Sequence, residues 1–146
     1  MRKTLWVFCA LLGSAGAVHA QPSPIGRVKA VTGEATIVRQ GAPIAVAPGL
    51  ALLQGDVLRT GPRGTLGVIL RDDTTLSLGA SSEVHLTEFV FDPAQAKLGL
   101  VLRLTRGLLA YASGKIARLA PEAARVETPV ATLGIRGTRL AVKVGR

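Results

Sequence analysis

The sequence predicts a single all-β domain, and two features carry this prediction. After residue 25, apolar and polar residues alternate with a period of two in segment after segment, as in strands with one buried face. Glycine, proline and aspartate interrupt these segments every several residues, and such residues favour turns. A helix is expected only near 117–124, where Pro121 limits it to about one turn.

The clearest alternation lies in segment 98–104, where a leucine occupies every second position. We expect Leu100 and Leu102 in the core and Thr105 on the opposite face. Similar alternation covers residues 66–71, 75–78, 83–87 and 139–144. The pattern by itself is compatible with a roll, a solenoid, a sandwich or a barrel.

The first twenty residues have the features of an export signal. Arg2 and Lys3 form a basic start, an apolar stretch follows, and Val18-His19-Ala20 offers small or apolar residues to a signal peptidase. The apolar stretch is short for a membrane span, which needs roughly 20 residues. We expect cleavage after Ala20 and a periplasmic or secreted protein; the alternative is an uncleaved anchor. Cys9 lies deep in the apolar stretch, which argues against a lipoprotein signal.

These features divide the chain into three parts. Residues 1–20 are the expected signal peptide, residues 21–25 a short extension, and residues 26–146 one β domain. Cleavage would remove the only cysteine, so the mature chain would have no disulfide, no thiol nucleophile and no cysteine metal ligand. A core of apolar side chains alone would stabilise it, which is feasible at this length.

The charge of the chain favours an anionic partner. Loss of Arg2 and Lys3 with the signal lowers the net charge from +9 to +7. For an exported protein the candidates are phosphorylated lipid headgroups, carboxylates of envelope glycans and acidic protein surfaces; the alternative is a solvated basic surface with no specific partner. Nucleic acid is not expected, because Phe89, Phe91 and Tyr111 are the only aromatic residues left for base stacking.

Two sequence blocks are the most distinctive parts of the chain. The first block consists of Gly55, Asp56, Thr60 and Gly61. The second block consists of Thr128, Pro129, Gly134, Arg136, Gly137 and Thr138. With the segments around them, they resemble the FecR domain, named for the ferric citrate regulator of bacterial iron uptake, over roughly residues 26–144.

The resemblance implies a fold and a role. It favours a twisted solenoid-like or roll-like arrangement of strands, with a sandwich or barrel as the alternative. It implies a periplasmic module that contacts other proteins. The regulator itself resembles a three-part device in which a cytoplasmic segment and a membrane helix precede the periplasmic part. Here an export signal takes the place of the first two parts, so direct signalling across the membrane is not expected.

Arg136 admits a structural and a functional interpretation. The glycines on either side leave room for its guanidinium to bind carbonyls or a carboxylate. We expect an internal ion pair with Asp56 or Asp73 as the acid; the alternative is an arginine that faces a ligand. By contrast, Arg39 and Arg63 are expected on the surface, with little effect on stability.

Catalysis, metals and cofactors are not expected. His85 is the only histidine after the signal, and one histidine beside Ser81 and Ser82 does not assemble a catalytic triad. The spacing of the aspartates matches no calcium loop, and no phosphate-binding glycine loop is present. We therefore expect a non-catalytic envelope module for protein interaction or sensing. The alternative is a binder of an anionic envelope polymer such as peptidoglycan or lipopolysaccharide.

Overall fold

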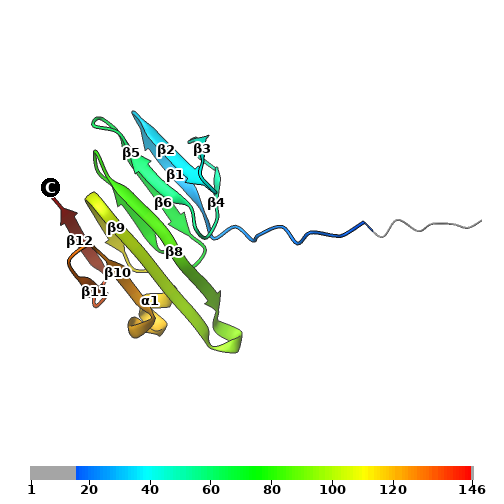
Figure 1. Cartoon of the computed structure of the whole chain (residues 1–146). Helices are drawn as coiled ribbons and strands as arrows, with labels where there is room; N and C mark the ends of the chain where they lie inside the picture. Colours follow the sequence, from blue (N-terminus) through cyan, green and yellow to red (C-terminus); the bar gives the residue numbers. More distant parts are fainter. Residues whose placement is uncertain (1–15, 146) are drawn as a thin grey trace, which may run out of the picture.

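The structure is a computed structural model that describes residues 16–145. Twelve β-strands form one strongly curled sheet, and the all-β prediction is confirmed (Figure 1). All neighbouring strands are antiparallel except β9 and β10. The strands are β1 (Gly26–Thr32), β2 (Ala35–Arg39), β3 (Ala42–Ala45), β4 (Ala51–Leu52), β5 (Val57–Thr60), β6 (Thr65–Leu70), β7 (Thr75–Leu78), β8 (Glu83–Asp92), β9 (Lys97–Ala112), β10 (Ala124–Glu127), β11 (Thr132–Gly134) and β12 (Arg139–Val144).

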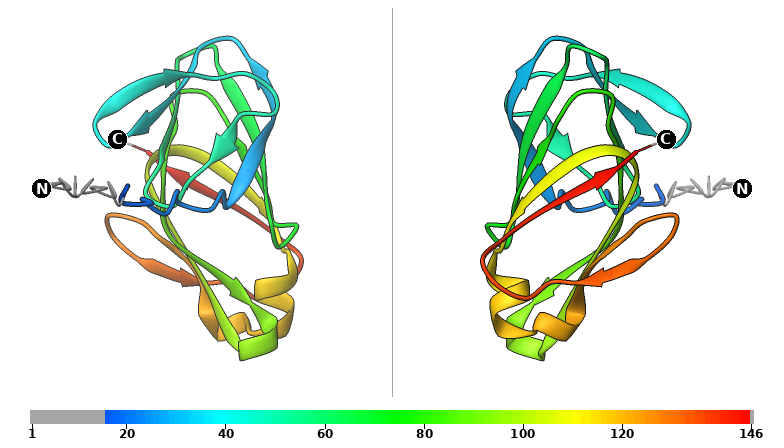
Figure 2. Two further views of the ribbon diagram at one scale, coloured as in Figure 1. Left: turned by 90° about the vertical axis from the view of Figure 1, so that its right-hand side faces the viewer. Right: turned by 90° about the vertical axis from the view of Figure 1, so that its left-hand side faces the viewer.

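The sheet consists of two halves that share β9. We call the path β4-β1-β6-β7-β9-β12 half-sheet A and the path β3-β2-β5-β8-β9-β10-β11 half-sheet B. The first part of β9 pairs with β8 and β10, and its last part, from Gly107 on, pairs with β12 and, from Leu109, with β7. Figure 2 shows the resulting curl from the side. This roll-like sheet has β10, β11 and β12 on the side of β9 away from β8.

The core lies between the two halves. It is built by the alternation along the strands, which turns every second side chain inward. Leu100 and Leu102 are buried as expected, and half-sheet A contributes Val68 and Leu76 to the same apolar cluster. Val101 is also buried, so β9 is covered on both faces at this position.

Short helical segments follow β9. Helix α1 spans Lys115–Leu119, and the 3-10 helix η2 spans Pro121–Ala123. The proline interrupts the helical segment as expected, because its ring prevents the α-helix from continuing. A further 3-10 turn, η1, covers Pro93–Gln95 between β8 and β9. None of the helices in residues 16–145 is long and apolar enough to cross a membrane.

Candidate functional site

The chain passes between the two half-sheets several times, and four of these passages lie together at one corner of the fold. The passages are Gly33-Glu34, residues 61–64, residues 79–82 and the Arg106-Gly107 step in β9. Backbone hydrogen bonds join them in a row: the Gly61 amide donates to the Glu34 carbonyl at 2.8 Å, and the Ser81 amide donates to the Gly61 carbonyl at 2.9 Å. We call this row the corner.

Two buried hydroxyl groups hold the corner together. The Thr60 hydroxyl donates to the Gly79 carbonyl at 2.6 Å and accepts the Ser82 amide at 2.9 Å. The Ser82 hydroxyl in turn accepts the Leu108 amide at 2.9 Å. Buried polar groups are costly unless they are hydrogen-bonded, and here each hydroxyl serves a neighbouring passage. Thr60 of the first block therefore has a structural role at the corner.

Glycine at the corner permits close approach of the passages. A Cβ at Gly64 would overlap the carbonyl oxygen of Glu34. At Gly107 the backbone has φ +87°, which L-residues rarely adopt, and a Cβ would overlap Ser82. Gly107 is thus the point at which β9 leaves half-sheet B and enters half-sheet A.

Asp56 of the first block is the acid of a nearly buried ion pair with Arg39. Its carboxylate is 1% exposed and accepts Arg39 Nε at 2.9 Å and Nη2 at 2.8 Å. It also accepts the Leu53 amide at 2.8 Å, and Arg39 Nη2 donates to the Ala51 carbonyl at 2.8 Å. The hydrogen bond to Asp56 raises the pKa of Arg39, against an opposing effect of burial. The guanidinium of Arg39 and the carboxylate of Asp56 thus join β2 to β4 and to the turn before β5. The expected placement of Arg39 on the surface is therefore wrong.

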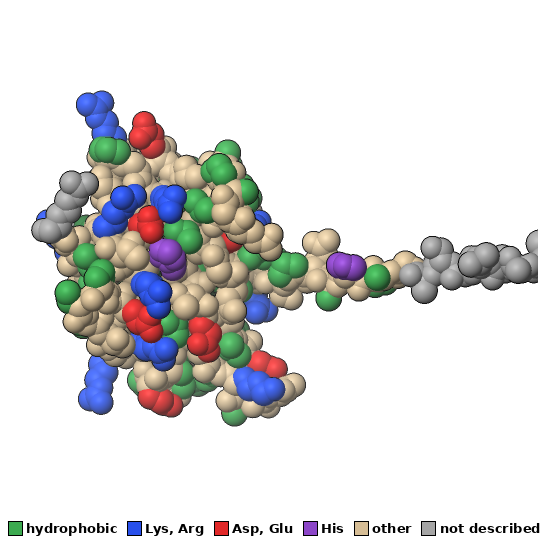
Figure 3. Space-filling view, in the orientation of Figure 1, with side chains coloured by type: hydrophobic (Ala, Val, Ile, Leu, Met, Phe, Trp, Pro, Cys, Tyr) green, Lys and Arg blue, Asp and Glu red, His purple; other side chains and the backbone are tan. Residues whose placement is uncertain are grey.

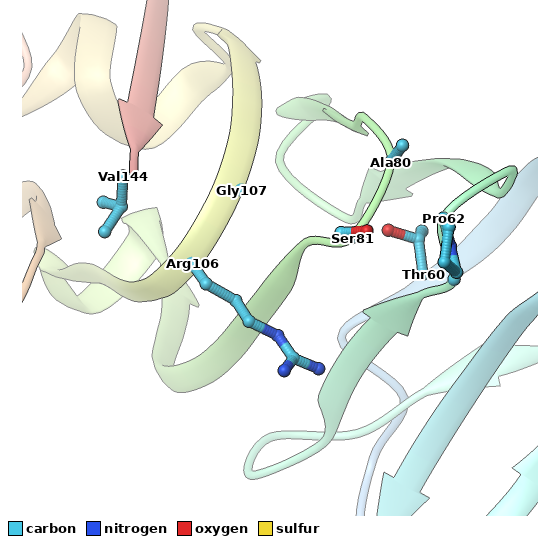
Figure 4. A pocket seen from close by; sticks show the side chains of 8 residues that line it. Thr60, Pro62, Ala80, Ser81, Arg106, Gly107 and Val144 are labelled. Carbon is cyan, nitrogen blue, oxygen red and sulfur yellow. The ribbon is translucent and has the colours of Figure 1, made fainter. Parts of the chain in front are cut away.

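A cavity of about 430 Å³ opens over the corner (Figure 4). Thr60, Ser81, Arg106 and Val144 are among its lining residues; Arg106 and Val144 lie on one side of the view, and Thr60 and Ser81 lie on the other. Arg106 Nη2 lies 3.7 Å from a Glu83 carboxylate oxygen. Because the Thr60 hydroxyl is already engaged, Arg106 and Ser81 are the polar side chains this cavity offers a ligand.

The outer face of half-sheet B carries a ladder of ion pairs. Glu83 accepts Arg59 Nε and His85 Nε2, both at 2.9 Å, and Glu127 accepts Arg103 at 3.1 Å and Arg125 at 3.2 Å. Figure 3 shows basic and acidic side chains mixed on this face of the molecule. Each acid lies between at least two basic partners, so the ladder keeps an excess of positive charge: four arginines face two glutamates.

The pKa of Glu83 is lowered overall. Burial acts to raise it, but the hydrogen bond from His85 and the charge and hydrogen bond of Arg59 outweigh burial. A group whose pKa is lower in the folded chain stabilises the fold above its unfolded pKa, and this contribution is lost as the pH falls through the folded pKa.

We therefore expect Glu83→Gln to cost stability at neutral pH and to cost progressively less in acid. The loss at pH 7 is expected to be up to about 1 kcal/mol, because the partners are largely exposed. The measurement is urea unfolding of both proteins between pH 7 and pH 3. A difference that stays constant below pH 4 would contradict the assignment. Thr87→Ser, an exposed change on the same strand, is the control.

A buried polar cluster occupies the end of the fold near α1. Asp72 is fully buried, and its carboxylate accepts the Thr74 hydroxyl at 2.7 Å and the Ile116 amide at 3.1 Å. Burial raises the pKa of the nearby Tyr111, whose hydroxyl has no hydrogen-bond partner among the described residues. The cluster fixes the start of α1 against the turn before β7.

The second block forms an exposed loop region after β10. Thr128 closes the turn between β10 and β11: its hydroxyl donates to the Ala131 carbonyl and accepts the Ala131 amide, both at 3.0 Å. Gly137 has φ +98°, and its carbonyl accepts the Ser113 hydroxyl at 2.7 Å. The Thr138 carbonyl accepts the Ser113 amide at 2.8 Å. The loop is thus attached to the end of β9, while Pro129 and Gly134 are exposed.

The predicted ion pair of Arg136 with Asp56 or Asp73 is wrong. Asp56 binds Arg39, and Asp73 lies 3.1 Å from Lys115. Arg136 is exposed and takes part in none of the ion pairs formed among residues 16–145. Asp56 and Asp73 bind Arg39 and Lys115 instead, and no pattern in the sequence links either acid to its cation.

Other features of the chain bear on the chemistry it can perform. No group of three or more potential metal-ligating side chains occurs in the part of the chain that the structure describes. The structural roles of Arg39, Asp72 and Ser82 are not evident in the sequence. Asp72 and Ser82 each have a partner far along the chain, Ile116 for Asp72 and Leu108 for Ser82, 44 and 26 residues away.

Comparison with known proteins gives one match. The FecR protein family matches residues 56–146. No curated protein and no solved structure matches the chain. The match begins at Asp56, yet β1 pairs with β6 and β2 pairs with β5, so residues 26–55 belong to the same sheet as the matched part.

Proposed function

Because this chain belongs to the FecR protein family, we propose that it is a non-catalytic module of the bacterial cell envelope that binds a protein partner in sensing or signalling. The family domain is associated with signalling and sensing. The observation that supports a binding role is the contrast between the two blocks. Asp56 and Thr60 of the first block are buried and serve the fold, whereas the second block presents its side chains to solvent.

The exposed side chains of the second block are of the kind that proteins bind. Val130, at the tip of the turn between β10 and β11, is 94% exposed. Arg136 projects from a loop whose backbone is fixed by Ser113. Val130 and Arg136 lie beyond opposite ends of β11. Arginine is enriched among binding hot spots, so the exposed Arg136 suits a protein-binding surface.

The features of the first twenty residues support export to the envelope. Residues 1–15 lie outside the described part of the chain, so this step rests on the basic start, the apolar stretch and Val18-His19-Ala20. In this proposal the signal is cleaved after Ala20, and the β domain acts in the periplasm or outside the cell.

The experiment places a photo-crosslinking amino acid at Val130 in cells and compares it with the same label at Arg63. Arg63 is exposed on the corner, away from the second block. We expect a discrete protein adduct from position 130 in the periplasmic fraction, and none from position 63. An intact Met1 in the cytoplasm would contradict export.

A second arm of this experiment tests the polymer alternative. The protein is sedimented with purified cell-wall sacculi and with lipopolysaccharide over a range of salt concentrations. Exposed charge contacts are screened by salt, so polymer binding would weaken steeply as salt is added. If the protein sediments with sacculi or lipopolysaccharide at low salt and position 130 gives no adduct, the partner is an anionic polymer and not a protein.

A further inference from the structure

The free edge of β11 is the feature on which this inference depends. β11 pairs with β10 along one edge only: Arg125 lies opposite Gly134, Val126 opposite Leu133 and Glu127 opposite Thr132. Its other edge has no strand beside it in the described part of the chain. An edge of this kind offers unpaired amide and carbonyl groups to an added strand.

The pairing identifies which backbone groups are free. The Thr128 amide donates to the Ala131 carbonyl, and the Ile135 amide donates to the Ala124 carbonyl. In an antiparallel pair, alternate residues direct both backbone groups to the partner strand. Residues 131, 133 and 135 therefore face β10, and Thr132 and Gly134 direct their amides and carbonyls outward.

The absence of a side chain at Gly134 keeps this edge accessible. A Cβ at Gly134 would meet nothing within 4 Å, and its φ lies outside the positive range that favours glycine. The fold itself therefore does not require glycine at this position. Glycine in a strand often marks a place where another backbone approaches closely, which is what an added strand would do here.

A charged side chain and a cavity lie next to the edge. Arg136 and Gly134 line a cavity of about 540 Å³ between the second block and the α1–η2 segment. Glu122, on the other wall, is the acidic residue of this lining. Arg125, on the neighbouring strand, is bound to Glu127 at 3.2 Å. Arg136 is thus the cation of this edge that has room for an external carboxylate, while Glu122 disfavours a long acidic run.

We propose that β11 receives an extended segment of the partner protein as an added β-strand, with one carboxylate of that segment bound to Arg136. This inference rests on the proposed function and specifies how the partner is bound. Main-chain hydrogen bonds to Thr132 and Gly134 hold the segment, and the Arg136 ion pair selects it. In a symmetric antiparallel contact between two β11 edges that is centred on Leu133, Arg136 of one copy would lie opposite Val130 of the other. A second copy is therefore a poorer occupant, because it offers Arg136 no carboxylate there.

The test uses a capped heptapeptide of alternating threonine and valine with one central glutamate. The peptide is added to protein that has been purified in the form the cells produce, after any cleavage of the signal. Amide exchange is then followed by NMR. We expect slower exchange at Thr132 and Gly134 and unchanged exchange at the free edge of β3. A peptide with glutamine in place of glutamate should bind about tenfold more weakly, as expected for loss of a charge-assisted hydrogen bond.

Two controls separate strand addition from charge attraction. N-methylation of the peptide at alternate amides keeps its charge but removes the donors for β11, and we expect it to abolish the protection. Arg136→Gln should weaken binding of the glutamate peptide about tenfold and leave binding of the glutamine peptide unchanged, whereas Arg63→Gln should alter neither.

The outcomes distinguish this inference from the proposed function. Equal binding of the methylated peptide, or no protection up to the solubility limit of the peptide, overturns strand addition. Protection of Thr132 and Gly134 without peptide, in a protein that elutes as a dimer, assigns the edge to a second copy and also overturns it. If position 130 still gives a protein adduct in these cases, the partner-binding role stands and only the binding mode is wrong.

Discussion

Arg39→Ala is expected to lower the free energy of unfolding by about 3 kcal/mol. The substitution leaves the Asp56 carboxylate, 1% exposed, with only the Leu53 amide as a hydrogen-bond partner. Removing one partner of a buried pair typically costs about 3–5 kcal/mol, because the remaining charge is poorly solvated. We expect the lower end, since Arg39 is 26% exposed and its loss admits water. The midpoint of thermal unfolding should fall by roughly 10 °C.

The matched control for this prediction is Arg63→Ala. Arg63 is the same residue type but is exposed, and it forms none of the ion pairs found in residues 16–145, so its loss should change stability by less than about 0.5 kcal/mol. Arg39→Lys keeps the charge without the planar fork and should fall between the two. Equal midpoints for Arg39→Ala and Arg63→Ala would show that the fork contributes nothing to stability.

The all-β fold could be predicted because it depends on local pattern. Leucines at every second position of β9 place one row of side chains inward, wherever the neighbouring strands come from. Glycine, proline and aspartate marked the turns for a similarly local reason. The parallel contact between β9 and β10 was not foreseeable, because the alternation of a strand does not reveal its direction relative to a neighbour.

The partners of the polar groups could not be predicted from the sequence. Asp56 was correctly singled out, but its cation is Arg39, seventeen positions earlier, and not Arg136. The choice depends on β2 pairing with β5, which brings the two side chains to one end of half-sheet B. Ser82 is similar: its hydroxyl reaches Leu108 only because β8 and β9 meet at the corner.

The exposure of the second block has the same origin. Glycines on either side of Arg136 suggested an internal ion pair, because glycine leaves room for close packing around the guanidinium. In the structure the side chain of Ile135 lies in the core and is 2% exposed. The next side chain along the chain, Arg136, therefore faces solvent. A single apolar residue thus fixes the orientation of the block, and the Arg136 side chain is exposed to solvent.

Leu102 lies in β9, the strand that both half-sheets share. Leu102→Ala is expected to cost about 2–5 kcal/mol, since the side chain is fully buried between Leu86 and Val126 on the neighbouring strands. Thr105→Ala, three residues along β9 on the outer face, is the control. Its hydroxyl makes one long contact, 3.4 Å to the Glu83 carbonyl, so its loss should cost less than about 1 kcal/mol.

The same substitution tests whether the two half-sheets unfold together. β9 is continuous through both, and the apolar cluster draws on both, so we expect one cooperative unit. If so, Leu102→Ala should speed the slowest amide exchange of β5 in half-sheet B and of β6 in half-sheet A by the same factor. For a loss of about 2.8 kcal/mol that factor is about 100. Acceleration confined to β5 would mean that half-sheet A stays folded when half-sheet B opens, and that Gly107 is a boundary between two independent units.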